Sequence, residues 1–286
     1  MNEKNFRLLQ IETEFSLAHF GAENPRQEAE MLFERAFGMS RLDLFMKKDE
    51  QPDPAQKAEL DRLLLERLSG RPIQYVLGEA DFMGLRLAVD ERVLIPRPET
   101  EELAALGIEL LRAAGGSGRS LRVLDLCTGS GAIACAVSEA LPEAEITASD
   151  LSEDALALAA LNFKGRANIM AVRSDLFDEL AGPYDMILSN PPYIPTDTVE
   201  ALESVVKDHE PHLALDGGAD GLDIVRRIIS RAPEMLAPGG SLLMEIGDDQ
   251  GEPAAELARG AGLKDVGIVK DAQGRDRMLR CRAPRS

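Results

Sequence analysis

The tetrad Asn190-Pro191-Pro192-Tyr193, which directly follows an apolar stretch over residues 184–189, is the first candidate for chemistry. Two consecutive prolines fix their φ angles and remove two backbone N–H donors, and a residue before proline is held extended. The side-chain oxygen of Asn190 and the carbonyl oxygen of Pro191 can then accept the two N–H bonds of one –NH2 group. Tyr193 offers a flat face for a planar amide or base. We therefore predict Asn190, Pro191 and Tyr193 as catalytic, and the whole tetrad, Pro192 included, as the substrate site.

Such a pair of acceptors suits methylation of an amide or amine nitrogen. An amide nitrogen is a poor nucleophile because its lone pair is delocalised. If both hydrogens are donated to fixed oxygens, negative charge localises on the nitrogen as it attacks. Positioning of this kind can supply about 7–11 kcal/mol of a barrier, and fixed dipoles add to it. No strong base is needed, since the proton can leave after methyl transfer. The alternative interpretation is a loop that the prolines merely stiffen.

A second candidate site follows another apolar stretch and contains Thr128, Gly129, Ser130 and Gly131. The two glycines let the backbone turn sharply and approach a ligand closely. Asp150 stands nineteen residues after the second glycine, at the end of the next apolar stretch. A carboxylate there can accept hydrogen bonds from ribose hydroxyls. This segment therefore predicts a nucleotide-like ligand.

The identity of that ligand is left open by the glycines, because Gly129, Gly131 and Ala134 also fit the dinucleotide fingerprint. A nicotinamide or flavin dinucleotide, or a plain tight turn, remains an alternative to S-adenosylmethionine. Two carboxylates favour the methyl donor. Asp125, four residues before the first glycine, could meet the donor's ammonium group. Asp175, after the third apolar stretch, could accept from the adenine amine, or it could simply cap a helix.

Strand and helix patterns alternate from residue 120 onward, which is typical of a parallel sheet with helices on both faces. Strands are expected at residues 123–126, 146–148, 169–172, 186–188 and 242–246. Helices are expected at residues 132–140, 154–163, 222–236 and 254–261. An antiparallel edge pair is expected at residues 266–269 and 278–281. Ligands of such sheets bind beyond the carboxyl ends of the strands, where both candidate sites fall.

The first 75 residues have helical patterns instead. Helix starts are predicted at Asn24-Pro25 and Asp53-Pro54, with ends at Gly38 and Gly70. The alternation of apolar residues over 85–89 predicts a strand, with residues 93–95 as its partner in a hairpin. The predicted division is therefore a helical domain (1–75), a hairpin link (76–98) and an α/β domain (99–286). A flexible turn is predicted at residues 115–118.

The composition, with 44% hydrophobic and 29% charged residues, is that of a globular protein. The net charge of −18 counts against a nucleic-acid partner, because phosphate binding needs clustered lysine and arginine. The three widely spaced cysteines suggest neither disulfides nor a zinc site. No apolar run reaches the ~18 residues of a membrane span, and the N-terminus lacks the apolar core of a signal peptide. A cytoplasmic protein without a membrane partner is expected.

Two features after the tetrad carry weaker signals. His209 and His212 could bind a metal, but a solvated loop is the simpler interpretation, so no metal site is predicted. The turn-rich residues 215–221 could shape the acceptor pocket or form a simple loop.

Together these segments resemble the release-factor glutamine methyltransferase family (PrmC/HemK) over nearly the whole chain. The tetrad alone is shared with enzymes that methylate the amino group of DNA adenine, whereas residues 93–101 are much more specific to this family. Besides the glycine loop and the tetrad, the segments that carry the resemblance are residues 70–78, 82–85, 93–101, 210–211, 215–218, 245–247, 250–251 and 274–277.

The resemblance implies a small helical N-terminal domain, a β-hairpin link and a seven-stranded Rossmann-like class I methyltransferase domain. It implies S-adenosylmethionine as cofactor. It also implies, as acceptor, the glutamine of the Gly-Gly-Gln loop in peptide chain release factors, so that methylation tunes translation termination. A docking role for the helical domain also follows from the family.

Carried over by residue, the family's donor site comprises Thr128 to Gly131, Asp150, Leu176 and Asn190. Leu176 stands where relatives can have an aromatic residue, which implies weaker packing against adenine. Cys127 stands where the family usually has glycine. If this position needs a positive φ, its Cβ is strained by about 1–2 kcal/mol.

Three other functions fit parts of the sequence. An adenine-amino DNA or RNA methyltransferase fits the tetrad, although the acidic charge and the lack of an evident basic recognition domain count against it. A nicotinamide-dependent oxidoreductase fits the glycine loop. A donor-binding or partner-binding module without catalysis would not explain the intact tetrad.

Overall fold

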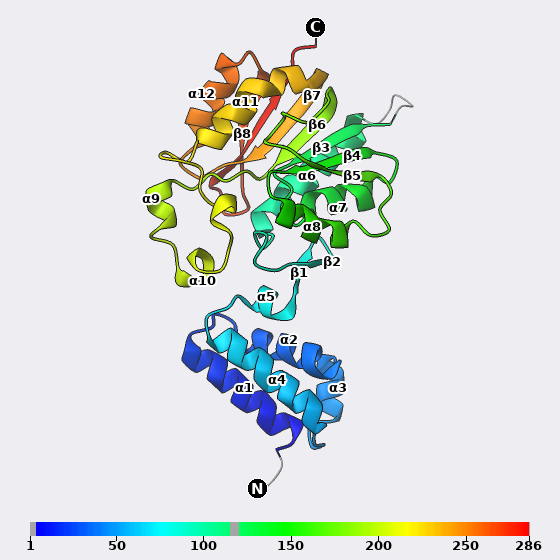
Figure 1. Cartoon of the computed structure of the whole chain (residues 1–286), viewed down its shortest axis with the longest axis vertical. Coiled ribbons are helices and arrows are strands. Elements are labelled where there is room, and N and C mark those ends of the chain that lie inside the picture. The colour runs from blue at the N-terminus through cyan, green and yellow to red at the C-terminus, as the bar shows by residue number, and fades with distance from the viewer. Residues whose placement is uncertain (1–3, 115–119, 286) are drawn as a thin grey trace. The chain divides into compact units, whose positions relative to one another are not determined.

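The computed structural model describes residues 4–114 and 120–285, and the predicted turn at residues 115–118 lies outside these ranges. The chain divides between Gly78 and Glu79 into two compact units of the described residues, coloured blue to cyan and cyan to red in Figure 1. Each unit has its own hydrophobic core.

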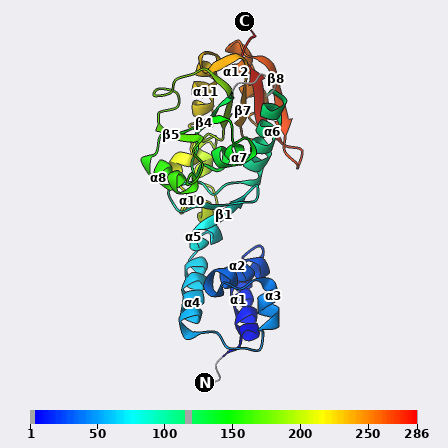
Figure 2. The ribbon, with the colours of Figure 1, turned by 90° about the vertical axis from the view of Figure 1, so that its right-hand side faces the viewer.

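The N-terminal unit is entirely helical in its described residues (Figure 2). Asp53 caps its helix as predicted, accepting from the Ala55 amide at 2.8 Å, whereas the Asn24 side chain makes no such bond. Gly38 ends the second helix in the left-handed conformation, as its position in the sequence predicted. Leu32, Phe33 and Leu63 are fully buried between the helices. The helices are α1 (Phe6–Phe20), α2 (Pro25–Phe37), α3 (Arg41–Met46), α4 (Pro54–Leu68) and α5 (Ile73–Leu77).

The second unit contains, among its described residues, a seven-stranded sheet with the order β5-β4-β3-β6-β7-β9-β8. The pairs from β5 to β7 are parallel, and β9 is antiparallel to both β7 and β8. The predicted parallel sheet with an antiparallel pair at its edge is confirmed. The strands are β3 (Arg122–Leu126), β4 (Glu145–Asp150), β5 (Ile169–Arg173), β6 (Tyr184–Ser189), β7 (Leu236–Glu245), β8 (Lys264–Lys270) and β9 (Asp276–Arg282).

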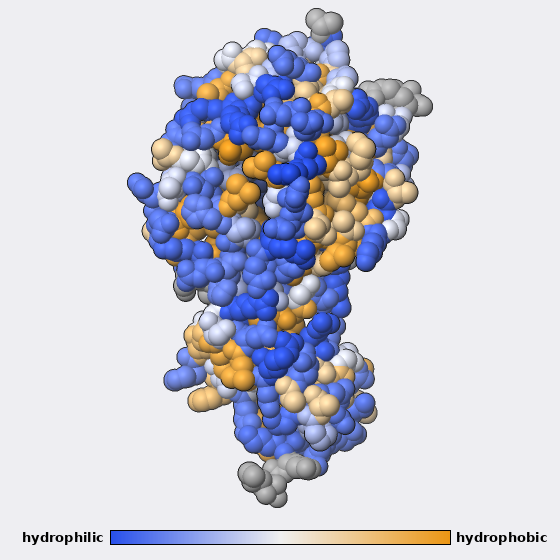
Figure 3. All heavy atoms as spheres, in the orientation of Figure 1, coloured by the Kyte–Doolittle hydropathy of each residue, from blue (hydrophilic) through white to orange (hydrophobic). Residues whose placement is uncertain are grey.

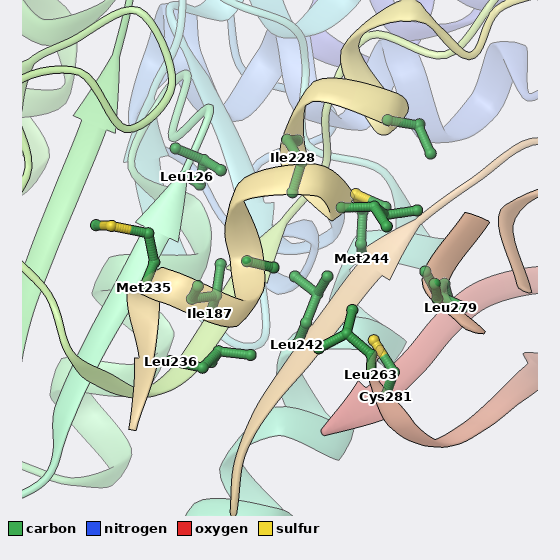
Figure 4. Close-up of a cluster of buried hydrophobic side chains, with 14 of the residues drawn as sticks. Leu126, Ile187, Ile228, Met235, Leu236, Leu242, Met244, Leu263, Leu279 and Cys281 are labelled. Carbon is green, nitrogen blue, oxygen red and sulfur yellow. The ribbon is translucent and has the colours of Figure 1, made fainter. Parts of the chain in front are cut away.

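Helices cover both faces of this sheet (Figure 1). The four predicted helices are present, each end within three residues of the predicted one, and α6 adds a fifth, for which no range was predicted. They are α6 (Pro98–Ala114), α7 (Ala132–Ala140), α8 (Glu153–Asn162), α11 (Asp223–Met235) and α12 (Gly251–Gly260). Successive side chains along a strand point to opposite faces of the sheet, so each strand contributes apolar side chains to both. Ile187 packs under α11 (Figure 4), while Leu188 packs on the opposite face with α6.

The hairpin differs from the prediction. Strand β2 (Leu85–Ala88) pairs with β1 (Glu79–Phe82), so residues 93–95 are not its partner. Met83 and Gly84 form the turn with φ of 50° and 78°, as a primed two-residue hairpin turn requires. Val93 instead donates its amide to the Asp90 carbonyl within a turn. The proline at each of positions 96 and 98 lacks the N–H that a longer strand there would need.

The segment after the tetrad contains short helices that the sequence did not predict: α9 (Thr196–Val199), α10 (Ser204–Lys207) and the 3-10 turn η1 (His212–Ala214). Each is less than two turns long, too short for a periodic apolar pattern. In the part of the chain that the structure describes, every helix is too short or too polar to cross a bilayer.

Candidate active site

The site begins where two neighbouring strands end. β3 and β6 run parallel, with Leu126 beside Ser189 as their last partners, in the middle of the sheet (Figure 1). The chain leaves β3 toward β4 on one side, and β6 leads to β7 on the other. Such a reversal of strand order opens a crevice at the carboxyl ends, where ligands bind in α/β sheets. The glycine loop and the tetrad therefore start side by side, although Thr128 and Asn190 are 62 positions apart in the sequence.

The loop after β3 turns on its glycines. Gly129 and Gly131 have φ of 54° and 81°, in the left-handed region that favours glycine. A Cβ added at Gly131 would lie 2.4 Å from the Phe163 ring, so only glycine fits there. A Cβ at Gly129 would meet nothing within 4 Å, which leaves that side of the loop open to a ligand. Thr128 donates its amide to the Ser149 carbonyl at 2.9 Å and so ties the loop to β4.

Asp150 ends β4 and holds the loop from the other side. Its carboxylate accepts from the amides of Gly129 and Ser152, each at 2.9 Å. It also lines a cavity at the carboxyl ends of the strands, so lone pairs remain for a ligand. Burial raises the pKa of this carboxyl above its usual value, and the two amides lower it.

Asp125 does not lie where the sequence suggested. Its side chain is fully buried beneath the loop, where it accepts from the Thr128 hydroxyl at 2.5 Å and the Ala134 amide at 2.9 Å. It is not among the residues that line the cavity. The strand turns this side chain beneath the loop and out of the cavity wall, so its contact with the ammonium group of a donor stays a prediction. Burial raises the pKa of Asp125 to about 7.

Cys127 and Leu176 border the cavity with unusual backbone angles, φ of 61° and 50°. The φ of Cys127 is positive, which is the condition under which its Cβ is strained, and the strain costs about 1–2 kcal/mol. Strain of this kind persists where the surrounding structure enforces it, which is common at functional sites. Burial raises the pKa of the Cys127 thiol, so the thiol stays protonated.

Asp175 lies at the rim of the same cavity and pairs with Arg227 of α11 at 2.8 Å. The turn that follows it is not a helix, so the alternative of a helix cap is wrong. Its carboxylate is about half exposed, and an ion pair at such a site contributes little to stability.

The cavity at this crevice holds about 1160 Å³, including space open to solvent. It brings together residues from the ends of β3, β4, β5 and β6. Among the predicted residues, its lining includes Thr128, Gly129, Ser130, Asp150, Asp175, Leu176, Asn190 and Pro192. Gly131 does not line the cavity, and a Cβ added there would face Phe163.

The tetrad separates this cavity from a second one of about 600 Å³. Asn190 lines both cavities, while Pro191 and Tyr193 line only the second, and Pro192 lines only the first. The second cavity is mostly apolar, with Leu202, Val206 and Leu215 in its wall and Arg97 as its charged member. A side chain in one cavity can thus approach a ligand in the other past Asn190.

The Asn190 side chain is held by a chain of hydrogen bonds. Its Nδ2 donates to Thr100 Oγ1 at 3.0 Å, and the Thr100 hydroxyl donates to Glu245 Oε2 at 2.8 Å. Tyr193 donates its hydroxyl to Glu245 Oε1 at 2.9 Å. Within the described residues no group donates to Asn190 Oδ1, so this oxygen is left for a ligand. Burial and the Glu245 charge raise the pKa of Tyr193, so its hydroxyl stays protonated.

The turn-rich stretch after the tetrad forms the back of this corner. Ile194, directly after the tetrad, donates its amide to the Leu215 carbonyl at 3.0 Å, and Gly217 donates its amide to the Ile194 carbonyl at 2.8 Å. A Cβ at Gly217 would lie 2.8 Å from Tyr193 Cα, so the close approach requires glycine. Leu215 lines the second cavity, which favours the interpretation in which residues 215–221 shape a pocket.

The sequence predicted no role for Thr100, Glu245 or Gln250, although all three lie in segments that carry the family resemblance. Gln250 donates its Nε2 to the Tyr193 carbonyl at 2.8 Å and so fixes the backbone of the corner. A signal for Glu245 was present, because a carboxylate within an apolar strand is rare unless it has partners. Thr100 gave no such signal, since it lies in an acidic stretch that opens a helix.

The histidines after the tetrad bring together no metal site. His212 is largely exposed, and its nearest carboxylate is Asp216 at 3.8 Å. Among the residues that the structure describes, no group of three or more histidine, cysteine or acidic side chains could hold a metal ion.

The fold and the two cavities define an α/β methyltransferase. A family model described as the methyltransferase small domain matches residues 105–219, and one described as the PrmC N-terminal domain matches residues 9–78. The solved structure of the hMettl16 catalytic domain in complex with MAT2A 3'UTR hairpin 6 shares the fold. Its TM-score is 0.58 at 19% identity, over 77% of this chain and 82% of that chain.

Full-length relatives identify the family. The release factor glutamine methyltransferase of Geobacter sulfurreducens is 40% identical, over 92% of this chain and 91% of its own length. That of Bordetella pertussis is 42% identical, over 89% of this chain and 93% of its own. The chain belongs to the release factor glutamine methyltransferase family.

The raised pKa of Asp125, which lies beneath the glycine loop, can be tested through the pH dependence of stability. A carboxyl whose pKa is higher in the folded state stabilises the fold at low pH, and this stability is lost as pH rises through the folded value of about 7. Replacing Asp125 by Asn removes the titration. We expect the unfolding midpoint in urea to fall more between about pH 5 and about pH 8 in the unmodified protein than in Asp125→Asn. The exposed Asp197→Asn is the control, and an unchanged pH dependence in Asp125→Asn would contradict the account.

Proposed function

We propose that this protein transfers a methyl group from S-adenosylmethionine to the side-chain amide nitrogen of the glutamine in the Gly-Gly-Gln loop of peptide chain release factors, which tunes translation termination. The observation that carries the proposal is Asn190, which lines both cavities and has its Oδ1 free of protein donors among the described residues. The family supports the same acceptor, since the relatives are named for it. The proposal locates the protein in the cytoplasm, where release factors act.

The larger cavity fits the methyl donor. Asp150 presents a carboxylate for the ribose hydroxyls, and the open side of Gly129 permits close approach of a ligand. Thr128, Ser130 and Leu176 complete the proposed contacts, with Asp175 at the adenine end and Gly131 shaping the loop. When bound, S-adenosylmethionine supplies an electrophilic methyl carbon on its sulfonium sulfur.

The smaller cavity fits the acceptor. Its apolar wall suits the methylenes of a glutamine side chain, and Tyr193 gives the amide a flat surface. Asn190 Oδ1 and the Pro191 carbonyl would accept the two amide hydrogens, which orients the nitrogen toward the other cavity. Acceptors held in this way by packed prolines need no rearrangement during the reaction. The proton lost from nitrogen leaves to solvent after transfer.

A nucleic-acid substrate is not expected. The net charge of −18 is unfavourable for binding a phosphate backbone. The tetrad would nevertheless accept an adenine amino group as readily as an amide, so the test of function includes DNA.

The most direct test is mass spectrometry of a release factor, or of duplex DNA, after incubation with the protein and S-adenosylmethionine. We expect one added methyl group on the Gly-Gly-Gln glutamine and none on DNA. Asn190→Ala should lower turnover by roughly a hundredfold or more, because it removes one of the two oriented acceptors. Its affinity for S-adenosylhomocysteine should stay within about threefold. Asn24→Ala, whose side chain makes no cap bond, is the matched control.

The result that would contradict the acceptor assignment is near-normal turnover in Asn190→Ala. Methylation of DNA and not of the release factor would show that the proposed substrate is wrong.

Asp150→Ala tests the donor site. Loss of a charged acceptor for ribose costs roughly 1.5–3 kcal/mol, so the dissociation constant of S-adenosylhomocysteine should rise about 10- to 100-fold. Isothermal titration calorimetry measures it, and the exposed Asp154→Ala of α8 serves as control. An unchanged affinity in Asp150→Ala would remove the ribose role.

The N-terminal unit, we propose, docks the release factor. Leu8, Ile11 and Phe15 of α1 are 50%, 55% and 72% exposed, and their spacing puts them along one side of the helix. Figure 3 shows apolar atoms exposed on the surface of this unit. Apolar side chains of this kind often mark contact surfaces.

We expect Ile11→Ser with Phe15→Ser to lower kcat/KM for an intact release factor about tenfold or more, because each buried apolar contact is worth about 1–3 kcal/mol. Turnover of a short Gly-Gly-Gln peptide should not change, because a peptide has no surface to dock. The comparison of kinetics on the two substrates is the measurement. Equal effects on factor and peptide, or none on either, would refute docking through this surface.

A further inference from the structure

The Asn190 amide raises a question of direction. A side-chain amide has an oxygen that accepts and a nitrogen that donates, and a half-turn about its last bond exchanges them. With the oxygen toward the acceptor cavity, it can accept from an –NH2 group. With the nitrogen toward that cavity, the Asn190 amide would present its N–H hydrogens to those of the substrate –NH2 group, and no hydrogen bond could form. The proposed function therefore requires a device that selects one orientation.

We propose that Thr100 and Glu245 are positioning residues that fix the Asn190 amide with its oxygen toward the acceptor. This inference rests on the proposed function. It deepens that function by assigning the buried groups that orient its principal acceptor.

The direction of the hydrogen bonds carries the argument. An ionised carboxylate accepts only, so both Thr100 and Tyr193 must donate their single hydroxyl hydrogens to Glu245, at 2.8 and 2.9 Å. Thr100 then has only lone pairs left for Asn190, 3.0 Å away. Asn190 must meet these lone pairs with its nitrogen, so its oxygen points away from Thr100. The charge of Glu245 thus sets the orientation through one intervening hydroxyl.

The surroundings make the alternative orientation costly. Thr100 is 5% exposed and Glu245 1%, so a mispaired oxygen has little access to solvent. The fold also explains the proximity, because Ser189 of β6 is the partner of Met244 of β7, which puts Asn190 and Glu245 at the ends of adjacent strands. Thr100 reaches them from the first turn of α6.

The same carboxylate also holds Tyr193. Because its hydroxyl donates to Glu245 Oε1, the ring that lines the acceptor cavity is fixed at its far end. Glu245 therefore orients both the acceptor oxygen and the flat surface beside it. Burial raises the pKa of Glu245 above its usual value, and the hydrogen bonds from Thr100 and Tyr193 together with the Arg277 charge oppose part of that rise. These partners favour the ionised form on which the orientation depends.

The test is the kinetics of Thr100→Val, which keeps the shape of the side chain but removes the hydroxyl. With a Gly-Gly-Gln peptide we expect kcat to fall roughly 10- to 100-fold. KM for the peptide and the dissociation constant of S-adenosylhomocysteine should stay within about threefold. Thr100→Ser, which restores the hydroxyl, should recover most of the loss. Thr147→Val, at another buried threonine, is the matched control.

Glu245→Gln provides an independent arm if Thr100→Val does not fold. It retains the volume but lets its amide nitrogen donate to Thr100, which frees that hydroxyl to donate to Asn190 and reverses the chain. We expect the same selective loss of kcat.

The inference is overturned if a folded Thr100→Val or Glu245→Gln keeps kcat within about threefold. It is also overturned if Thr100→Ser fails to recover what Thr100→Val loses. Failure of the proposed function would look different, because the unmodified protein would then methylate no glutamine peptide.

Discussion

The parallel pairing of β3 with β6 is the constraint on which the site depends. It puts Leu126 beside Ser189, so the loop that borders the larger cavity and the tetrad that borders the smaller one begin at neighbouring backbone positions. Strand order reverses at this pair, which opens the crevice between the two chain paths. Both faces of the strands are buried, so a slip in register would expose apolar side chains and is strongly disfavoured.

Costly local features gather around this crevice. Cys127 and Leu176 adopt left-handed backbone angles, and Asp125 and Glu245 are buried carboxylates. Each is unfavourable alone, and each is held by neighbours: Asp125 by the Thr128 hydroxyl, Glu245 by Thr100 and Tyr193. Costs of this kind persist where surrounding contacts enforce them, and functional sites are where they commonly cluster.

The sequence predicted the order of strands and helices in the α/β unit, because apolar periodicity there is strong. It also located the two loops that border the crevice. It failed where contacts between distant segments decide the outcome. The hairpin partner was wrong because Met83 looks nothing like a turn residue, although Gly84 beside it does. The burial of the Asp125 side chain was not predicted, because spacing along a strand does not say which face a side chain takes. The role of Thr100 was not predicted, because it exists only beside Asn190 and Glu245.

The central claim is that two fixed oxygens of the tetrad receive the –NH2 group of a glutamine. A crystal structure of the protein with S-adenosylhomocysteine and a Gly-Gly-Gln peptide tests it most directly. The account predicts the glutamine Nε2 at about 3 Å from both Asn190 Oδ1 and the Pro191 carbonyl oxygen. A glutamine amide bound elsewhere, or an Asn190 amide with its nitrogen toward the substrate, would contradict it.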